Sequence, residues 1–161
     1  MSQYISTIAN GGSRLQPHLL KEIRGSSETE EIGPLEKSFE TRVLNTIDTD
    51  PAFMNRVREG FYAVTHYPGG YGVGYTDWSM EAAGKTGTSQ SFIDTNNDGV
   101  IDTETITSSF IGYAPYYDPK MSIVVTSPDS SHPNSDNNYM SLVTYYLTQA
   151  LTGKYTELYG Y

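Results

Sequence analysis

The residues with the clearest chemical potential form one short run, GKTGT at positions 84–88. The run combines the ammonium group of Lys85 with the hydroxyls of Thr86 and Thr88, while Gly87 has no side chain to obstruct a bound molecule. A cation beside hydroxyl and backbone N–H donors is suited to bind an anion or to stabilise a developing oxyanion. The run therefore predicts an anion-recognising site, and the secondary structure around it decides which kind.

Two interpretations of this run need different secondary structures. A phosphate-binding loop needs a glycine five residues before Gly84 and a helix whose N-terminus begins at the lysine. Position 79 is Ser79, and residues 87–91 (GTSQS) do not favour a helix. The second interpretation places the run along the edge of a β-strand, as in serine acyl-transferases with a Lys-Thr-Gly motif. We favour this second interpretation. Its purely structural alternative is the end of a strand that carries an exposed lysine and has no function.

A group of oxygen-bearing residues follows the run and raises the question of a metal. Four residues have the ligand spacing of a calcium loop, with Gly99 at its sharp turn: Asp94, Asn96, Asp98 and Asp102. The twelfth position of such a loop is normally a bidentate Glu, but here it is Thr105, preceded by Glu104. Calcium binding would therefore be weak, and a polar hairpin tip is the competing interpretation because Asn, Asp and Gly favour turns. A calcium-dependent extracellular binding module is the alternative function.

Hydrophobic spacing and turn residues predict the elements that position these residues. Helices are expected over 2–10, 51–65 and 137–152, and strands over 18–23, 41–47, 82–92, 107–114 and 121–126. Asp50 and Pro51 begin the middle helix, whose apolar face would be Phe53, Val57, Phe61 and Val64. Gly153 would end the last helix, whose apolar positions include Val143, Leu147 and Leu151. Residues 115–120 (PYYDPK) suit a hairpin turn, so the fold is predicted to be α+β, with an antiparallel sheet and the C-terminal helix packed on it.

Composition and charge exclude several partners. The net charge is −9, which opposes binding to nucleic acid or to an anionic membrane surface. The chain has no cysteine, which excludes disulfides, thiolate zinc sites and thiol catalysis. Its three histidines, His18, His66 and His132, lack a zinc-binding spacing. There is no run of apolar residues long enough to span a membrane, so we expect no membrane contact from this segment.

Five stretches resemble, in order and spacing, the C-terminal half of the transpeptidase domain of class B penicillin-binding proteins from Gram-positive bacteria. They are STIANGGSRLQPH (6–18), GFYAV (60–64), AAGKTGTSQ (82–90), SSFIGYAP (108–115) and MSIVV (121–125). The resemblance covers nearly the whole chain, so residues 1–161 would be one portion of a serine-transpeptidase domain with a β-lactamase-like fold. It implies cross-linking of peptidoglycan stem peptides through a serine acyl-enzyme, inhibition by β-lactams, no required cofactor, and a parent protein anchored outside the cytoplasm.

The resemblance also implies roles for individual residues. Lys85 would set the electrostatics of the cleft and assist proton movement, Thr86 and Gly87 would contact the substrate, and the backbone N–H of Thr88 would complete the oxyanion hole. The nucleophile of this family lies in a Ser-x-x-Lys motif, and no such tetrapeptide occurs in the 161 residues. The N-terminal half of the domain would supply it, so we expect this chain alone to be inactive. The Ser-x-Asn match at Ser135–Asn137 follows the lysine strand instead of preceding it, which favours a helix N-cap.

Overall fold

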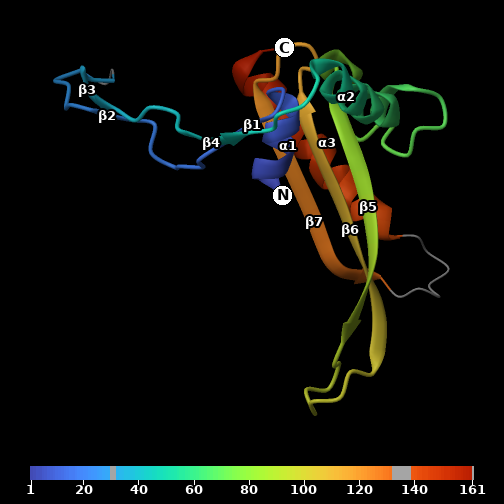
Figure 1. Ribbon diagram of the computed structural model, residues 1–161. Coiled ribbons are helices and arrows are strands. Elements are labelled where there is room, and N and C mark those ends of the chain that lie inside the picture. The colour runs from blue at the N-terminus through green and yellow to red at the C-terminus, as the bar shows by residue number, and fades with distance from the viewer. Residues whose placement is uncertain (30–31, 132–138, 161) are drawn as a thin grey trace.

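The computed structural model describes residues 1–29, 32–131 and 139–160 (Figure 1). In chain order the elements are α1 (Ser2–Ala9), β1 (Ser13–Leu15), β2 (Glu22–Arg24), β3 (Leu35–Ser38), β4 (Val43–Thr46), α2 (Pro51–His66), η1 (Trp78–Met80), β5 (Ala83–Ile93), β6 (Thr103–Ala114), β7 (Met121–Ser131) and α3 (Tyr139–Tyr159). Within these described residues, no helix is both long and apolar enough to cross a membrane.

The main sheet has the strand order β5-β6-β7, and both strand pairs are antiparallel. This confirms the predicted α+β fold, and β6 and β7 both extend further than their apolar runs indicated. The turn between them closes where the Lys120 N–H donates to the Ala114 carbonyl at 2.8 Å. Beyond β7 the β5–β6 hairpin continues as a two-stranded projection that ends at residues 94–102 (Figure 1).

Consecutive residues of β6 face opposite sides of the sheet and belong to different core clusters. Ile111 and Tyr113 pack with Ile5, Ile8 and Ala9 of α1. Phe110 packs with Ile123 and Val125 of β7, against Tyr75 and Tyr145. Side chains alternate along a strand, so α1 covers one face of the sheet and α3 the other (Figure 1).

Helix α2 begins as predicted but packs through different residues. The Asp50 carboxylate accepts a hydrogen bond from the Ala52 N–H at 2.8 Å, which caps the helix. The predicted apolar face is wrong at its first two positions, because Phe53 is 68% exposed and Val57 is 45% exposed. From its middle onward the helix meets the sheet: Arg58 donates to the Tyr113 hydroxyl of β6 at 3.3 Å, and Thr65 Oγ1 donates to the Ala82 carbonyl, next to the start of β5, at 2.6 Å.

Helix α3 departs more clearly from its predicted limits and orientation. It runs through Gly153 to Tyr159, so Gly153 does not end it; a left-handed glycine follows at Gly160 (φ +71°). The side chains that meet the sheet are hydroxylic, with Thr144, Thr148 and Thr152 fully buried, whereas the predicted apolar positions Val143, Leu147 and Leu151 are exposed. The predicted N-cap at Ser135–Asn137 lies outside the described residues.

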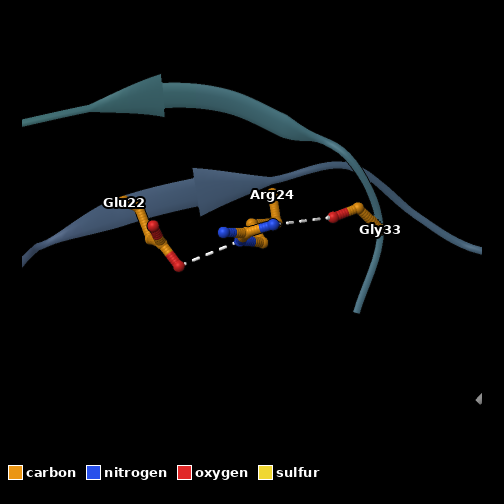
Figure 2. A network of polar contacts seen from close by, with 3 residues as sticks. All are labelled: Glu22, Arg24 and Gly33. Atoms are coloured by element: carbon orange, nitrogen blue, oxygen red, sulfur yellow. Dashed lines mark hydrogen bonds and ion pairs between the residues drawn. The ribbon is translucent and has the colours of Figure 1, made fainter. Parts of the chain in front are cut away.

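Residues 13–29 and 32–47 form an arm that projects away from the main sheet (Figure 1). The arm contains two small antiparallel pairs, β1 with β4 and β2 with β3. At its end the Arg24 guanidinium donates to Glu22 Oε1 at 2.9 Å and to the Gly33 carbonyl at 3.5 Å (Figure 2). The strand predicted over 18–23 is thus displaced toward Arg24, while β4 lies inside its predicted range.

Candidate active site on the edge of strand β5

The GKTGT run lies in the interior of β5, with β6 on one side of it. Among the described residues no strand pairs with its other side, so β5 is an edge strand. Lys85 and Thr88 are exposed, and Thr86 and Gly87 are half-buried. Because Lys85 lies within a strand and not at a helix N-terminus, the phosphate-binding-loop interpretation is wrong.

The functional groups of the run emerge on two sides of this edge. Lys85 lies opposite Ile111 in the ladder and shares the face covered by α1. Thr86 and Thr88 lie on the face covered by α3. The Lys85 ammonium donates to the neighbouring Thr86 carbonyl at 2.5 Å, so it rests against its own strand. To reach a bound carboxylate it must rotate outward, which its exposure permits.

The strand next to the run requires Gly84, whereas at Gly87 a side chain would have to displace the Ser109 hydroxyl. A Cβ on Gly84 would come within 2.3 Å of the Phe110 ring, and a Cβ on Gly87 within 2.4 Å of Ser109 Oγ. Gly84 therefore makes room for the core ring beneath β5, a role that the motif itself did not reveal. Gly87 keeps the strand surface low beside Ser109, which is compatible with the close approach of another backbone.

The start of β5 is fixed by contacts from outside the motif. Thr65 of α2 donates to the Ala82 carbonyl, and the Tyr116 N–H donates to the Glu81 carbonyl at 2.8 Å. Glu81 has a φ of +45°, a left-handed conformation that is strained for a residue with a side chain. These supporting residues carry no recognisable motif, and sequence reasoning missed them because their partners are distant in the chain.

The loop after β5 has the hydrogen bonding of a polar turn. The Asp94 carboxylate accepts N–H bonds from Gly99 (2.7 Å), Asn96 (3.2 Å) and Asp98 (3.3 Å), and Asp102 accepts from Thr95 Oγ1 (2.7 Å). The Gly99 N–H is the main cause of a lowered pKa at Asp94. In the part of the chain that the structure describes, no three His, Asp or Glu side chains are grouped to hold a metal. Calcium binding here stays a prediction.

The two candidates for the twelfth calcium ligand both have other partners. Glu104 accepts a hydrogen bond from Gln90 across the β5–β6 ladder at 2.6 Å. Thr105 is buried, and its hydroxyl donates to Asp129 at 2.6 Å. In this conformation neither residue supplies the bidentate carboxylate that a calcium loop normally has beside ligands such as Asp94, Asn96, Asp98 and Asp102.

Comparison with known proteins gives a consistent result. Residues 1–148 match the family model described as the penicillin-binding protein transpeptidase domain. The chain is 35% identical over 158 residues to penicillin-binding protein 2A of Bacillus subtilis, and 28% identical over 135 residues to penicillin-binding protein 2B of Streptococcus pneumoniae. These matches span 98% and 82% of this chain, but only 22% and 19% of the two relatives.

Solved structures agree on the fold. Penicillin-binding protein 2B of Streptococcus pneumoniae superposes with a TM-score of 0.74 at 24% identity, covering 99% of this chain and 24% of that one. Penicillin-binding protein A of Mycobacterium tuberculosis, in its penicillin G acyl-enzyme complex, gives 0.59 at 16% identity and covers 95% and 31% of the two chains. Through the family match over residues 1–148, the chain belongs to the penicillin-binding protein transpeptidase domain family, a class of serine acyl-transferases.

Proposed function

We propose that this chain supplies the Lys-Thr-Gly wall of a D,D-transpeptidase that cross-links peptidoglycan stem peptides through a serine acyl-enzyme. The observation that carries the proposal is the position of the GKTGT run on an accessible edge strand. An extended peptide can add to such an edge through main-chain hydrogen bonds, while side chains along the edge select its terminus. Because the chain belongs to the transpeptidase family, we interpret this edge as the binding site of the substrate peptide.

Each residue of the run then has a defined task. The Lys85 ammonium, once rotated outward, attracts the carboxylate of a D-alanyl-D-alanine terminus or of a β-lactam and assists proton movement. The Thr86 and Thr88 hydroxyls donate to that carboxylate, and the Thr88 backbone N–H lies at the free edge, where it stabilises the oxyanion of the tetrahedral intermediate. Gly87 lets the substrate backbone approach the strand.

The nucleophile must come from another portion of the domain, because the chain has no Ser-x-x-Lys motif. Two features of the surface support such a partner. Val143, Leu147 and Leu151 of α3 are between 41% and 53% exposed on the side that faces away from the sheet. The outer edge of β7 also has no partner strand among the described residues. Exposed apolar faces and long unpaired edges are features that stable domains normally cover.

We infer that the N-terminal half of the same domain covers these surfaces and forms the second wall of the cleft. The complete protein would work outside the cytoplasm, anchored to the bacterial membrane, because its stem-peptide substrate is in the cell wall. The isolated chain is then unable to form an acyl-enzyme, since a lysine and two hydroxyls without an activated serine bind the ligand but do not react with it.

Labelling with a fluorescent penicillin tests the proposal. The 161-residue chain alone should remain unlabelled, and addition of the Ser-x-x-Lys portion of the domain should restore covalent labelling. In the restored complex, Lys85→Ala should slow acylation by about a hundredfold or more, the usual effect of removing one electrostatic group from such a site. Lys37→Ala, which changes an exposed lysine on β3, should leave the rate unchanged. Covalent labelling of the chain by itself would refute the proposed dependence on a second portion.

A further inference from the structure

A layer of aromatic rings covers the junction between α2 and the turn that joins β6 to β7. Tyr62 stacks on His66 with ring centroids 4.0 Å apart, and its ring lies 4.7 Å from that of Tyr116. Two further rings pack edge-on against these. The interplanar angle is 88° between Tyr67 and Tyr62, and 76° between Tyr117 and Tyr116. We refer to Tyr62, Tyr67, Tyr116 and Tyr117 as the tyrosine cluster.

The rings of Tyr67 and Tyr117 are exposed to solvent, while the two rings on which they pack are fixed by contacts with the rest of the protein. Tyr67 is 62% exposed and Tyr117 is 74% exposed, whereas Tyr62 and Tyr116 are half-buried. Arg58 of α2 donates to the Tyr116 carbonyl at 2.5 Å, and its guanidinium lies 5.3 Å from the centre of the Tyr116 ring. Rings supported in this way lose little freedom when a ligand binds, which is what a preorganised recognition surface requires.

Charges around the cluster select the kind of ligand. Burial raises the pKa values of Tyr62 and Tyr116, and the Glu81 carboxylate raises that of Tyr62 further. At Tyr116 the Arg58 guanidinium lowers the pKa and the Glu59 carboxylate raises it, so the two charges act in opposite directions. The neighbouring cations Arg56 and Lys120 are engaged in ion pairs, with Glu59 at 2.9 Å and with Asp118 at 2.8 Å. The third cation, Arg58, donates to the Tyr116 carbonyl and to the Tyr113 hydroxyl. The surface therefore offers ring faces and hydrogen-bond acceptors and opposes an anion. A sugar chain, with apolar ring faces and many hydroxyl donors, meets these requirements.

The cluster lies at the beginning of the strand that carries Lys85. Tyr116 is hydrogen-bonded to Glu81, which is four residues before Lys85. An extended chain rises about 3.3 Å per residue, so Lys85 lies at most about 13 Å from Glu81, which holds Tyr116. A peptide bound beside Lys85 and the sugar to which that peptide is attached can occupy the two places together.

We propose that the tyrosine cluster binds the glycan chain that carries the stem peptides, with Tyr67 and Tyr117 packing on sugar rings and Glu59 and Glu81 accepting hydrogen bonds from sugar hydroxyls. This inference rests on the proposed transpeptidase function, because that function places a glycan-linked peptide at β5. Binding at the cluster would hold the substrate by its unreactive part and so orient the stem peptide along the strand.

An NMR titration of the 161-residue chain with a soluble oligomer of β-linked N-acetylglucosamine tests the proposal. We expect shift changes at the cluster residues, and saturation transfer from the tyrosine rings to the sugar protons in the unsubstituted chain. Tyr67→Ala and Tyr117→Ala should each weaken binding about tenfold, the value of one good ring contact. Tyr71→Ala is the matched control, because Tyr71 lies on the same loop and is 88% exposed but is absent from the cluster.

Three results would overturn the proposal. The first is the absence of both NMR signals at about 10 mM oligomer, a concentration at which even a ligand with a millimolar Kd would be bound. The second is an equal effect of the Tyr71 and Tyr67 substitutions on binding. The third is loss of sugar binding when the nucleophile-bearing portion is added, since that portion would then cover the cluster. Acylation by a small penicillin should be unaffected by Tyr67→Ala and Tyr117→Ala. Failure of acylation with intact glycan binding would therefore count against the transpeptidase function, not against this surface.

Discussion

Thr144 of α3 and Ser108 of β6 are joined by a 2.8 Å hydrogen bond between two buried hydroxyl groups. The helix meets the sheet through threonines on this side, since Thr148 and Thr152 are also buried and donate to the carbonyls of Thr144 and Thr148. Bonding back along the helix satisfies their hydroxyls without partners from the sheet, so α3 can pack closely while its leucines face outward.

The pair should therefore contribute to stability. Thr144→Val keeps the shape of the side chain but leaves the buried Ser108 hydroxyl without its donor, and we expect the free energy of unfolding to fall by about 1–2 kcal/mol. Urea denaturation followed by circular dichroism measures the change. Thr156→Val is the control, because the half-buried Thr156 donates along its own helix, to the Thr152 carbonyl at 3.1 Å, and not to Ser108. Equal losses in the two variants would show that Ser108 is not the cause.

Cap and turn residues in the sequence correctly predicted the elements that they begin or connect. The cap at Asp50 and Pro51 placed the start of α2 correctly, and the turn residues at 115–120 placed the β6–β7 hairpin. The GKTGT run was correctly assigned to a strand because the residues after it do not favour a helix. In each case the decisive interaction lies within a few residues of the signal, so no knowledge of the tertiary structure is needed.

Orientation could not be predicted in the same way. Helical spacing identified Val143, Leu147 and Leu151 as an apolar face, but these residues point away from the sheet and threonines take their place. Spacing shows that a helix has two faces, and the choice between them depends on which other surfaces are available. The same holds at the site, where Thr65 and Glu81 support β5 through contacts that only the folded chain brings together.

The two arginines of α2 differ sharply in what they contact, and we expect them to differ in stability. Arg58 bonds the Tyr116 carbonyl and the Tyr113 hydroxyl, whereas Arg56 forms an exposed ion pair with Glu59. Arg58→Ala should lower the free energy of unfolding by about 2–3 kcal/mol, because a charge-assisted bond to the turn is lost. Arg56→Ala should change it by less than about 0.5 kcal/mol. Thermal denaturation of the two variants side by side gives the comparison, and similar melting temperatures would contradict it.

His66 should make the docking of α2 sensitive to pH. Burial lowers its pKa below the ordinary value near 6.5, although a backbone bond at Tyr62 and the nearby Glu81 act in the opposite direction. The unfolded chain then takes up a proton before the folded chain does. The free energy of unfolding should accordingly decrease as the pH falls through 6.5, and level off below the folded-state pKa.

The contribution of His66 can be isolated by comparing the chain with His66→Gln. The two proteins differ at no other position, so the difference between their unfolding free energies at pH 7.5 and at pH 5 reports on His66. We expect the unsubstituted chain to lose more stability on acidification than the variant. An identical pH dependence would mean that the His66 ring is as accessible to solvent in the folded chain as in the unfolded one.

The loop after β5 should keep its conformation without calcium, because Asp94 already accepts three backbone N–H bonds within the loop. With Glu104 and Thr105 bonded elsewhere, calcium should bind no more tightly than about 1 mM, the weak end of the range for extracellular modules. Calorimetric titration with and without chelator measures this affinity. Asp98→Asn removes the charge of this position but keeps a residue that favours turns. Micromolar calcium binding that disappears in this variant would instead support the calcium-dependent alternative.

The same hydrogen bonds set the behaviour of the loop in acid. The pKa of Asp94 is lowered chiefly by the Gly99 N–H, so the ordered loop is favoured above the unfolded-state pKa near 3.9 and loses that support as the pH falls through the lower folded-state value. Amide shifts of Asn96, Asp98 and Gly99 should report a common transition at that lower pH. In Asp94→Asn, which has no charge to lose, this transition should be absent, and its persistence would assign the titration to Asp102.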